Sequence, residues 1–130
     1  MATTEKWVQG RIRDMLSARG FQHEKVWGNS INAGFPDLFV GRFWIEVKAP
    51  GRKLRPTQVD WFERFVPQGT AAYVCDDPKQ LWEILCHPDT WIDGRACLGR
   101  PGSAPSNWKE FAPRVHHQDK MNDALRRFQS

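Results

Sequence analysis

Three charged side chains interrupt the apolar stretch "GFPDLFVGRFWIEVKAP", which covers residues 34–50. Asp37, Glu46 and Lys48 lie inside its two apolar runs and not in the polar turns beside them. Two carboxylates with room for water between them supply the hard oxygen ligands that Mg²⁺ prefers. A lysine next to such a cation stabilises negative charge that develops on a phosphate. These residue types therefore predict a metal site that acts on phosphodiesters.

A two-residue turn at Gly41-Arg42 decides which residues of the stretch face each other. Glycine at the first turn position suits a type II′ hairpin, and counting outward from it places Asp37 opposite Glu46. Lys48 follows two residues later on the same face of the sheet. Like charges directly opposite each other destabilise a sheet. The other face is predicted to be apolar and to consist of Leu38, Val40, Phe43, Ile45 and Val47.

The three charges also fit a purely structural role. Lys48 could pair with Glu46, and Asp37 could cap the start of the hairpin after Pro36. The basic loop after the hairpin favours the metal site, because a phosphodiester substrate needs positive charge around it. The cations of this loop, predicted to contact nucleic acid, are Arg52, Lys53 and Arg55.

Helices and strands around the hairpin predict an α/β domain with a central mixed sheet flanked by helices. A first helix is expected between its N-cap, Thr4, and its stop signal, Gly20. "HEKVWG" then fits a strand, and a second helix is expected between Pro56 and Pro67. "TAAYVC" reads as a buried strand, followed by a helix that Asp77 caps.

The domain core is predicted to span residues 1–86, with a less regular C-terminal extension over residues 87–130 that serves dimerisation or DNA contact. The Gly/Pro/Ser-rich segment "GRPGSAPSN" within the extension resembles a linker. Apolar residues near the C-terminus recur at helical spacing and suit either a dimer interface or a helix that folds back. They are Met121, Leu125 and Phe128.

Composition agrees with one soluble domain inside a cell. The chain has 130 residues, of which 40% are hydrophobic and 26% charged, and a net charge of +4. Its three cysteines are widely spaced and odd in number, which argues against a disulfide framework. No apolar run approaches the length of a membrane span, and the N-terminus lacks the pattern of a signal peptide. The expected location is the cytoplasm, or the interior of an infected host cell.

The order of residues around the hairpin resembles one nuclease family. The string "GFPDL", followed by "IEVKAPGRKLRPTQVDWF", is similar to the virus-type replication–repair (VRR-NUC) branch of the PD-(D/E)XK nucleases. This resemblance, which extends over residues 5–75, implies a restriction-endonuclease-like core and a deoxyribonuclease that depends on Mg²⁺ or Mn²⁺. It implies that Asp37 and Glu46 bind the metal with the main-chain carbonyl of Val47. Lys48 would then position or activate the attacking water.

Two further residues match positions in the family. Gln58 matches the glutamine of this branch, and its inward helix face means that its amide needs a partner. A metal-bound water, a phosphate oxygen, Lys48 or the backbone at the helix start would each serve. Glu5 fits a glutamate that family members place near the metal, and equally fits a first-turn acid that complements the helix dipole. Asn29 and Ser30 are candidates for phosphate contact or simple turn formers.

The resemblance also bears on substrate and assembly. Compact members of the family look like Holliday-junction resolvases and act as homodimers, which implies a structure-selective endonuclease of junction or branched DNA. An exonuclease or end-processing enzyme on the same fold is the first alternative. A DNA-binding module without catalysis is the second, although such a module has no evident reason to retain opposed carboxylates.

Overall fold

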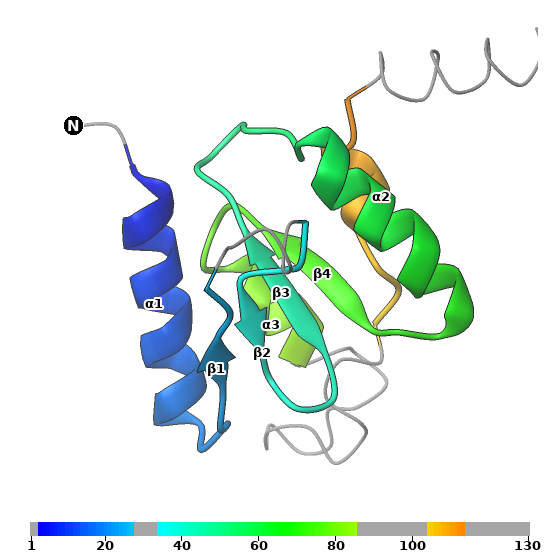
Figure 1. The fold of residues 1–130 in the computed structure, drawn as a ribbon. Coiled ribbons are helices and arrows are strands. Elements are labelled where there is room, and N and C mark those ends of the chain that lie inside the picture. Colours follow the sequence, from blue (N-terminus) through cyan, green and yellow to red (C-terminus); the bar gives the residue numbers. More distant parts are fainter. Residues whose placement is uncertain (1–2, 28–33, 86–103, 114–130) are drawn as a thin grey trace, which may run out of the picture.

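A four-stranded mixed sheet forms the centre of the computed structural model, which describes residues 3–27, 34–85 and 104–113 (Figure 1). The first three strands are antiparallel neighbours, and the fourth runs parallel to the third. In chain and sheet order they are β1 (Glu24–Lys25), β2 (Leu38–Phe39), β3 (Trp44–Val47) and β4 (Ala72–Cys75). The predicted α/β class with a mixed sheet is confirmed.

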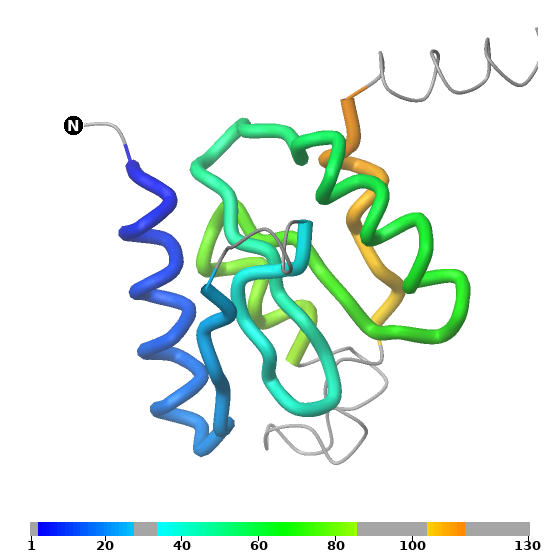
Figure 2. The backbone as a smooth tube through the Cα atoms, viewed as in Figure 1, coloured from blue at the N-terminus to red at the C-terminus, as the bar shows by residue number. Residues whose placement is uncertain are grey.

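Helices cover both faces of this sheet, as the backbone trace in Figure 2 shows. They are α1 (Glu5–Ala18), α2 (Pro56–Phe65) and α3 (Gln80–Leu85), with short 3₁₀ helices η1 (Val66–Gln68) and η3 (Trp108–Phe111). The N-cap predicted for α1 is confirmed, because Thr4 Oγ1 accepts a hydrogen bond of 3.1 Å from Trp7 N–H. No helix within the described residues is long and apolar enough to cross a membrane.

The helix after β4 begins two residues later than predicted, at Gln80 and not at Pro78. Asp77 does accept a hydrogen bond from Lys79 N–H through its side chain. The next amides, however, donate to carbonyls three residues earlier, beginning with Gln80 N–H to the Asp77 carbonyl at 3.0 Å. This tighter winding is typical of a helix terminus, so α3 itself begins at Gln80.

The β2–β3 hairpin has the predicted register. Leu38 faces Ile45, and Phe39 faces Trp44. Gly41 has a φ of 84°, the left-handed conformation that glycine adopts without steric cost. The face predicted to be apolar is buried, and all five of its side chains belong to one core cluster. The alternation of the strands therefore places Glu46 on the opposite face.

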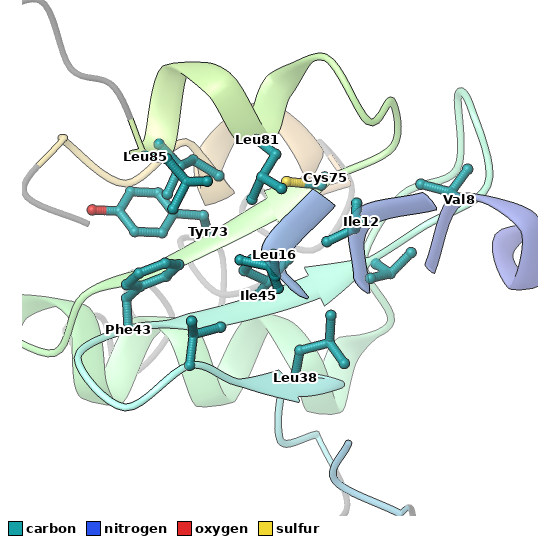
Figure 3. Packing of buried hydrophobic residues seen from close by; sticks show 13 residues of the cluster. Val8, Ile12, Leu16, Leu38, Phe43, Ile45, Tyr73, Cys75, Leu81 and Leu85 are labelled. Carbon is teal, nitrogen blue, oxygen red and sulfur yellow. The ribbon is translucent and has the colours of Figure 1, made fainter. Parts of the chain in front are cut away.

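Two hydrophobic clusters, one on each face of the sheet, hold the helices in place. The first packs α1 and α3 against the sheet, with Val8, Ile12 and Leu16 of α1 among its buried residues (Figure 3). The second packs α2 and η3 against the other face. Glu46 projects toward this second face, where its neighbour on α2 is Gln58.

Residues 104–113 complete the second cluster, although the sequence places them in the C-terminal extension. The Asn107 side-chain amide hydrogen-bonds to the edge of β4 as the backbone of a neighbouring strand would. It accepts from Val74 N–H and donates to the Val74 carbonyl, each at 2.8 Å. Leu54 N–H donates to the Phe111 carbonyl at 2.9 Å, while Trp108 and Phe111 are buried against α2. This segment thereby covers the edge of β4 and packs with the core.

Candidate active site

The structure buries three of the residues singled out by the sequence. Glu46 is 2% exposed, Gln58 3% and Lys48 6%. They are the buried polar and charged side chains among the residues that the structure describes. Charged groups are almost never fully buried unless they are paired, so their convergence indicates a functional site.

Gln58 holds the Glu46 carboxylate from one side. Its Nε2–H donates to Glu46 Oε1 at 3.1 Å, and its own Oε1 accepts from Arg55 N–H at 2.8 Å. The amide therefore caps the start of α2 and reaches β3 at the same time. Its partners are the Arg55 backbone amide, which is the helix-start partner expected from the sequence, and Glu46, which was not among the partners expected.

Glu46 Oε2 is buried and accepts no hydrogen bond from a protein donor. The carboxyl group lies against Asp37, to which it can hydrogen-bond when one of the two is protonated. Burial raises the pKa of Glu46 well above its usual range, and the negative charge of Asp37 raises it further. Lys48 opposes these effects by favouring the ionised form. Glu46 thus combines a buried oxygen that accepts no hydrogen bond with a carboxyl group that resists ionisation.

Asp37 directly precedes β2, and its side chain bonds to β3. Asp37 Oδ2 accepts a hydrogen bond of 2.8 Å from Val47 N–H. By the alternation of the antiparallel ladder, Pro36 is the residue that would bond to Val47. Proline has no N–H, so it cannot donate to the Val47 carbonyl. The sequence "PD" consequently leaves this carbonyl without its ladder donor, next to two carboxylates.

Glu5 occupies the first turn of α1 and is exposed. Its negative charge is nevertheless close enough to contribute to the raised pKa of Glu46. The position is compatible with both roles expected from the sequence, since a first-turn acid also complements the helix dipole.

The basic loop between β3 and α2 exposes its cationic side chains and buries its leucine. Leu54 is buried, while Arg52, Lys53 and Arg55 are exposed. Lys53 Nζ donates to the Glu110 carbonyl at 3.1 Å, so this lysine also helps to hold residues 104–113. The other two nucleic-acid-contact candidates, Asn29 and Ser30, lie outside the described residues.

Gly34 is a site residue that sequence reasoning missed. Its φ is 84°, and a Cβ built on it would lie 2.3 Å from the Thr57 carbonyl oxygen. Glycine therefore permits the chain leading to Asp37 to approach the start of α2, which carries Gln58, at backbone contact. The glycine at the head of "GFPD" is the signal that could have identified this approach.

The groups here that could hold a cation are the carboxylates of Asp37 and Glu46 and the main-chain carbonyl of Val47. No three His, Cys, Asp or Glu side chains gather into a metal-binding group in the described part of the chain. Mg²⁺ is commonly held by one or two carboxylates and keeps several waters. The partnerless Glu46 Oε2, Asp37 and the Val47 carbonyl suit that requirement.

No protein-family model matches the chain, and no curated protein matches its sequence.

We predict that the metal-free protein loses stability as the pH rises, through Glu46. The folded protein keeps the Glu46 proton at pH values at which the unfolded chain releases it, because the folded pKa is raised above the ordinary value of 4.5. The free energy of unfolding therefore falls as the pH rises from the pKa of Glu46 in the unfolded chain to its higher pKa in the folded protein. Urea unfolding in EDTA between pH 5 and 8 measures the effect, and Glu46→Gln should flatten the slope. Identical slopes for the variant and the wild type would contradict the assignment.

Proposed function

We propose that this protein is a divalent-metal-dependent deoxyribonuclease with a restriction-endonuclease-like core, related to the VRR-NUC branch that its sequence resembles. The observation that carries the proposal is the buried Glu46 carboxylate, whose Oε2 lacks a partner beside Asp37. A structural role would have given this oxygen a donor, because an unsatisfied buried polar atom costs about 1–3 kcal/mol. A bound cation resolves both this cost and the repulsion between the carboxylates.

Each residue of the site then has a definable role. Asp37 and Glu46, with the Val47 carbonyl, would hold Mg²⁺ or Mn²⁺. The ion would neutralise charge on the phosphate and lower the pKa of the attacking water. Gln58 fixes the orientation of Glu46 through Nε2. Lys48 supplies a positive charge at the edge of the site, where it orients the water or stabilises the phosphate.

DNA is the proposed partner. The exposed cations of the loop before α2 would hold phosphates that flank the scissile bond, and the net charge of +4 has the appropriate sign. A homodimer acting on junction or branched DNA stays a prediction from the family resemblance. The apolar stripe that suggested a dimer interface lies outside the described residues.

Cleavage assays on several DNA structures test the proposal. Supercoiled plasmid, a four-way junction, a flap and a blunt duplex would each be incubated with Mg²⁺, with Mn²⁺ and with EDTA. We expect metal-dependent cleavage that includes nicking of the closed plasmid, since an endonuclease needs no free end. Digestion of linear substrates alone would favour the exonuclease alternative. Binding of DNA with no cleavage of any substrate would favour the non-catalytic module.

A further inference from the structure

A groove distinct from the carboxylate site runs between α1 and the turn that connects β4 to α3. Its volume is about 750 Å³, within the range of roughly 300–1,000 Å³ that small-molecule sites occupy. The lining is mainly apolar and comes from three separate parts of the chain. The residues that matter here are Trp7, Arg11, Met15, Pro50, Lys79 and Trp82.

Two exposed tryptophans make this groove unusual. Trp7 is 53% exposed and Trp82 is 38% exposed. The Arg19 guanidinium lies 3.7 Å from the centre of the Trp82 ring, a cation–π contact that helps to hold the indole in place. Exposed apolar side chains that gather in one groove commonly mark a binding site, whereas single exposed ones are ordinary surface residues.

The charges around the groove suit a flat, neutral group. The acids of the lining are engaged by the protein itself: Asp76 Oδ2 accepts from Gly51 N–H, and Asp77 Oδ1 accepts from Lys79 N–H. Arg11 and Lys79 are also among the residues that line the groove. The base of a nucleotide within a strand meets these conditions, because the base is planar and neutral while the sugar that bears it has a phosphate on either side.

The position of the groove connects it to the carboxylate site. Pro50 follows Lys48 by two residues and belongs to the loop that carries the exposed cations. Asp76, directly after β4, bonds to Gly51 of that loop at 3.1 Å. β3 and β4 are parallel, so their carboxyl ends lie at the same end of the sheet. Figure 1 shows the loop from β3 to α2 at the end of the sheet nearest the N-terminal half of α1.

We propose that this groove binds an unpaired base of the DNA strand that is cleaved, and stacks it on Trp7 and Trp82. The inference rests on the proposed nuclease function and names a feature of its substrate. Bases inside an intact duplex have both faces covered by their neighbours, whereas an unpaired base is free to stack on an aromatic side chain. The groove therefore favours DNA with unpaired nucleotides next to the scissile phosphate.

Binding without metal tests the groove separately from catalysis. Fluorescence anisotropy would follow labelled oligothymidylate and a blunt duplex of equal length, in EDTA. We expect Trp7→Ala and Trp82→Ala each to weaken oligothymidylate binding about tenfold, with little effect on the duplex. Trp7→Phe should retain most of the affinity, because it keeps an aromatic face. Trp27→Ala is the matched control, since Trp27 is 71% exposed and does not line the groove.

Equal affinity of all variants for oligothymidylate would overturn the inference. So would self-association that Trp7→Ala abolishes, because the groove would then hold a second copy of the chain. The two proposals fail in different ways. If the protein cleaves DNA with metal but the tryptophan variants bind normally, only the proposal for the groove is refuted. If binding depends on the tryptophans but no DNA is cleaved, only the proposed nuclease function is refuted.

Discussion

Glu46→Gln is expected to lower DNA cleavage by about 10³-fold while making the metal-free protein more stable. The variant keeps the shape of the side chain and an oxygen for the Gln58 amide, which lies 3.1 Å from Glu46 Oε1. It removes the charge that burial and Asp37 disfavour. Removal of one group that stabilises the transition state typically costs about 10²–10³ in rate, and the loss of a metal ligand should be at the upper end.

The gain in stability distinguishes a ligand from a structural residue. At pH 8 in EDTA, we expect urea unfolding to show that Glu46→Gln has a free energy of unfolding about 1–3 kcal/mol higher than the wild type. This is the usual cost of an uncompensated buried polar group. Mg²⁺ should raise the melting temperature of the wild type and leave that of the variant unchanged. Glu83→Gln, on the exposed face of α3, is the control and should change neither quantity. A destabilised Glu46→Gln protein would show that the carboxylate is structural.

Asp37 needs a different substitution for the same comparison. Its Oδ2 accepts from Val47 N–H at 2.8 Å, so alanine would remove a contact between β2 and β3 as well as a charge. Asparagine retains an acceptor oxygen and isolates the charge. We therefore expect Asp37→Asn to abolish cleavage and to leave the thermal stability of the metal-free protein equal or higher.

Gly34→Ala is expected to destabilise the protein by about 2–4 kcal/mol and to remove cleavage with it. The added Cβ would lie 2.3 Å from the Thr57 carbonyl oxygen, and the φ of 84° is itself unfavourable for alanine. The chain before Asp37 must then move away from α2, which separates Asp37 from the Gln58–Glu46 pair. Urea unfolding and the plasmid assay measure the two effects.

Gly41→Ala is the matched control for this substitution. Gly41 has the same φ of 84°, but a Cβ added there meets nothing within 4 Å. Its replacement should cost only the conformational strain, about 1–2 kcal/mol, and should leave the site assembled. If the two variants were equally stable and equally active, the close approach of Gly34 to α2 would not be what holds the site together.

The hairpin was the most predictable part of the molecule, because its information is local. Glycine at position 41 determines the turn, the turn determines the register, and the register determines the face of every side chain. The apolar face, and the position of Glu46 on the face opposite to it, follow from this count. The N-cap at Thr4 and the start of α2 at Pro56 are equally local and are confirmed.

Features that depend on distant parts of the chain could not be predicted in this way. Residues 104–113 contain little regular structure, yet Asn107 completes the hydrogen bonding of β4 and Trp108 closes the second cluster. The Gln58 amide donates a hydrogen bond to Glu46, and this contact depends on how α2 crosses the sheet. The groove likewise combines α1 with a turn about seventy residues later, a pairing that no sequence period signals.

The sequence by itself therefore determined which charges share one face of the β2–β3 hairpin and the chemistry that they suggest. The tertiary structure alone decided that Glu46 is buried with one oxygen unsatisfied, and that Gly34 brings Asp37 to the start of α2. The physical reason is that side-chain direction along a strand follows from local geometry. Burial and the partners of a polar atom depend on packing between elements that are remote in the chain.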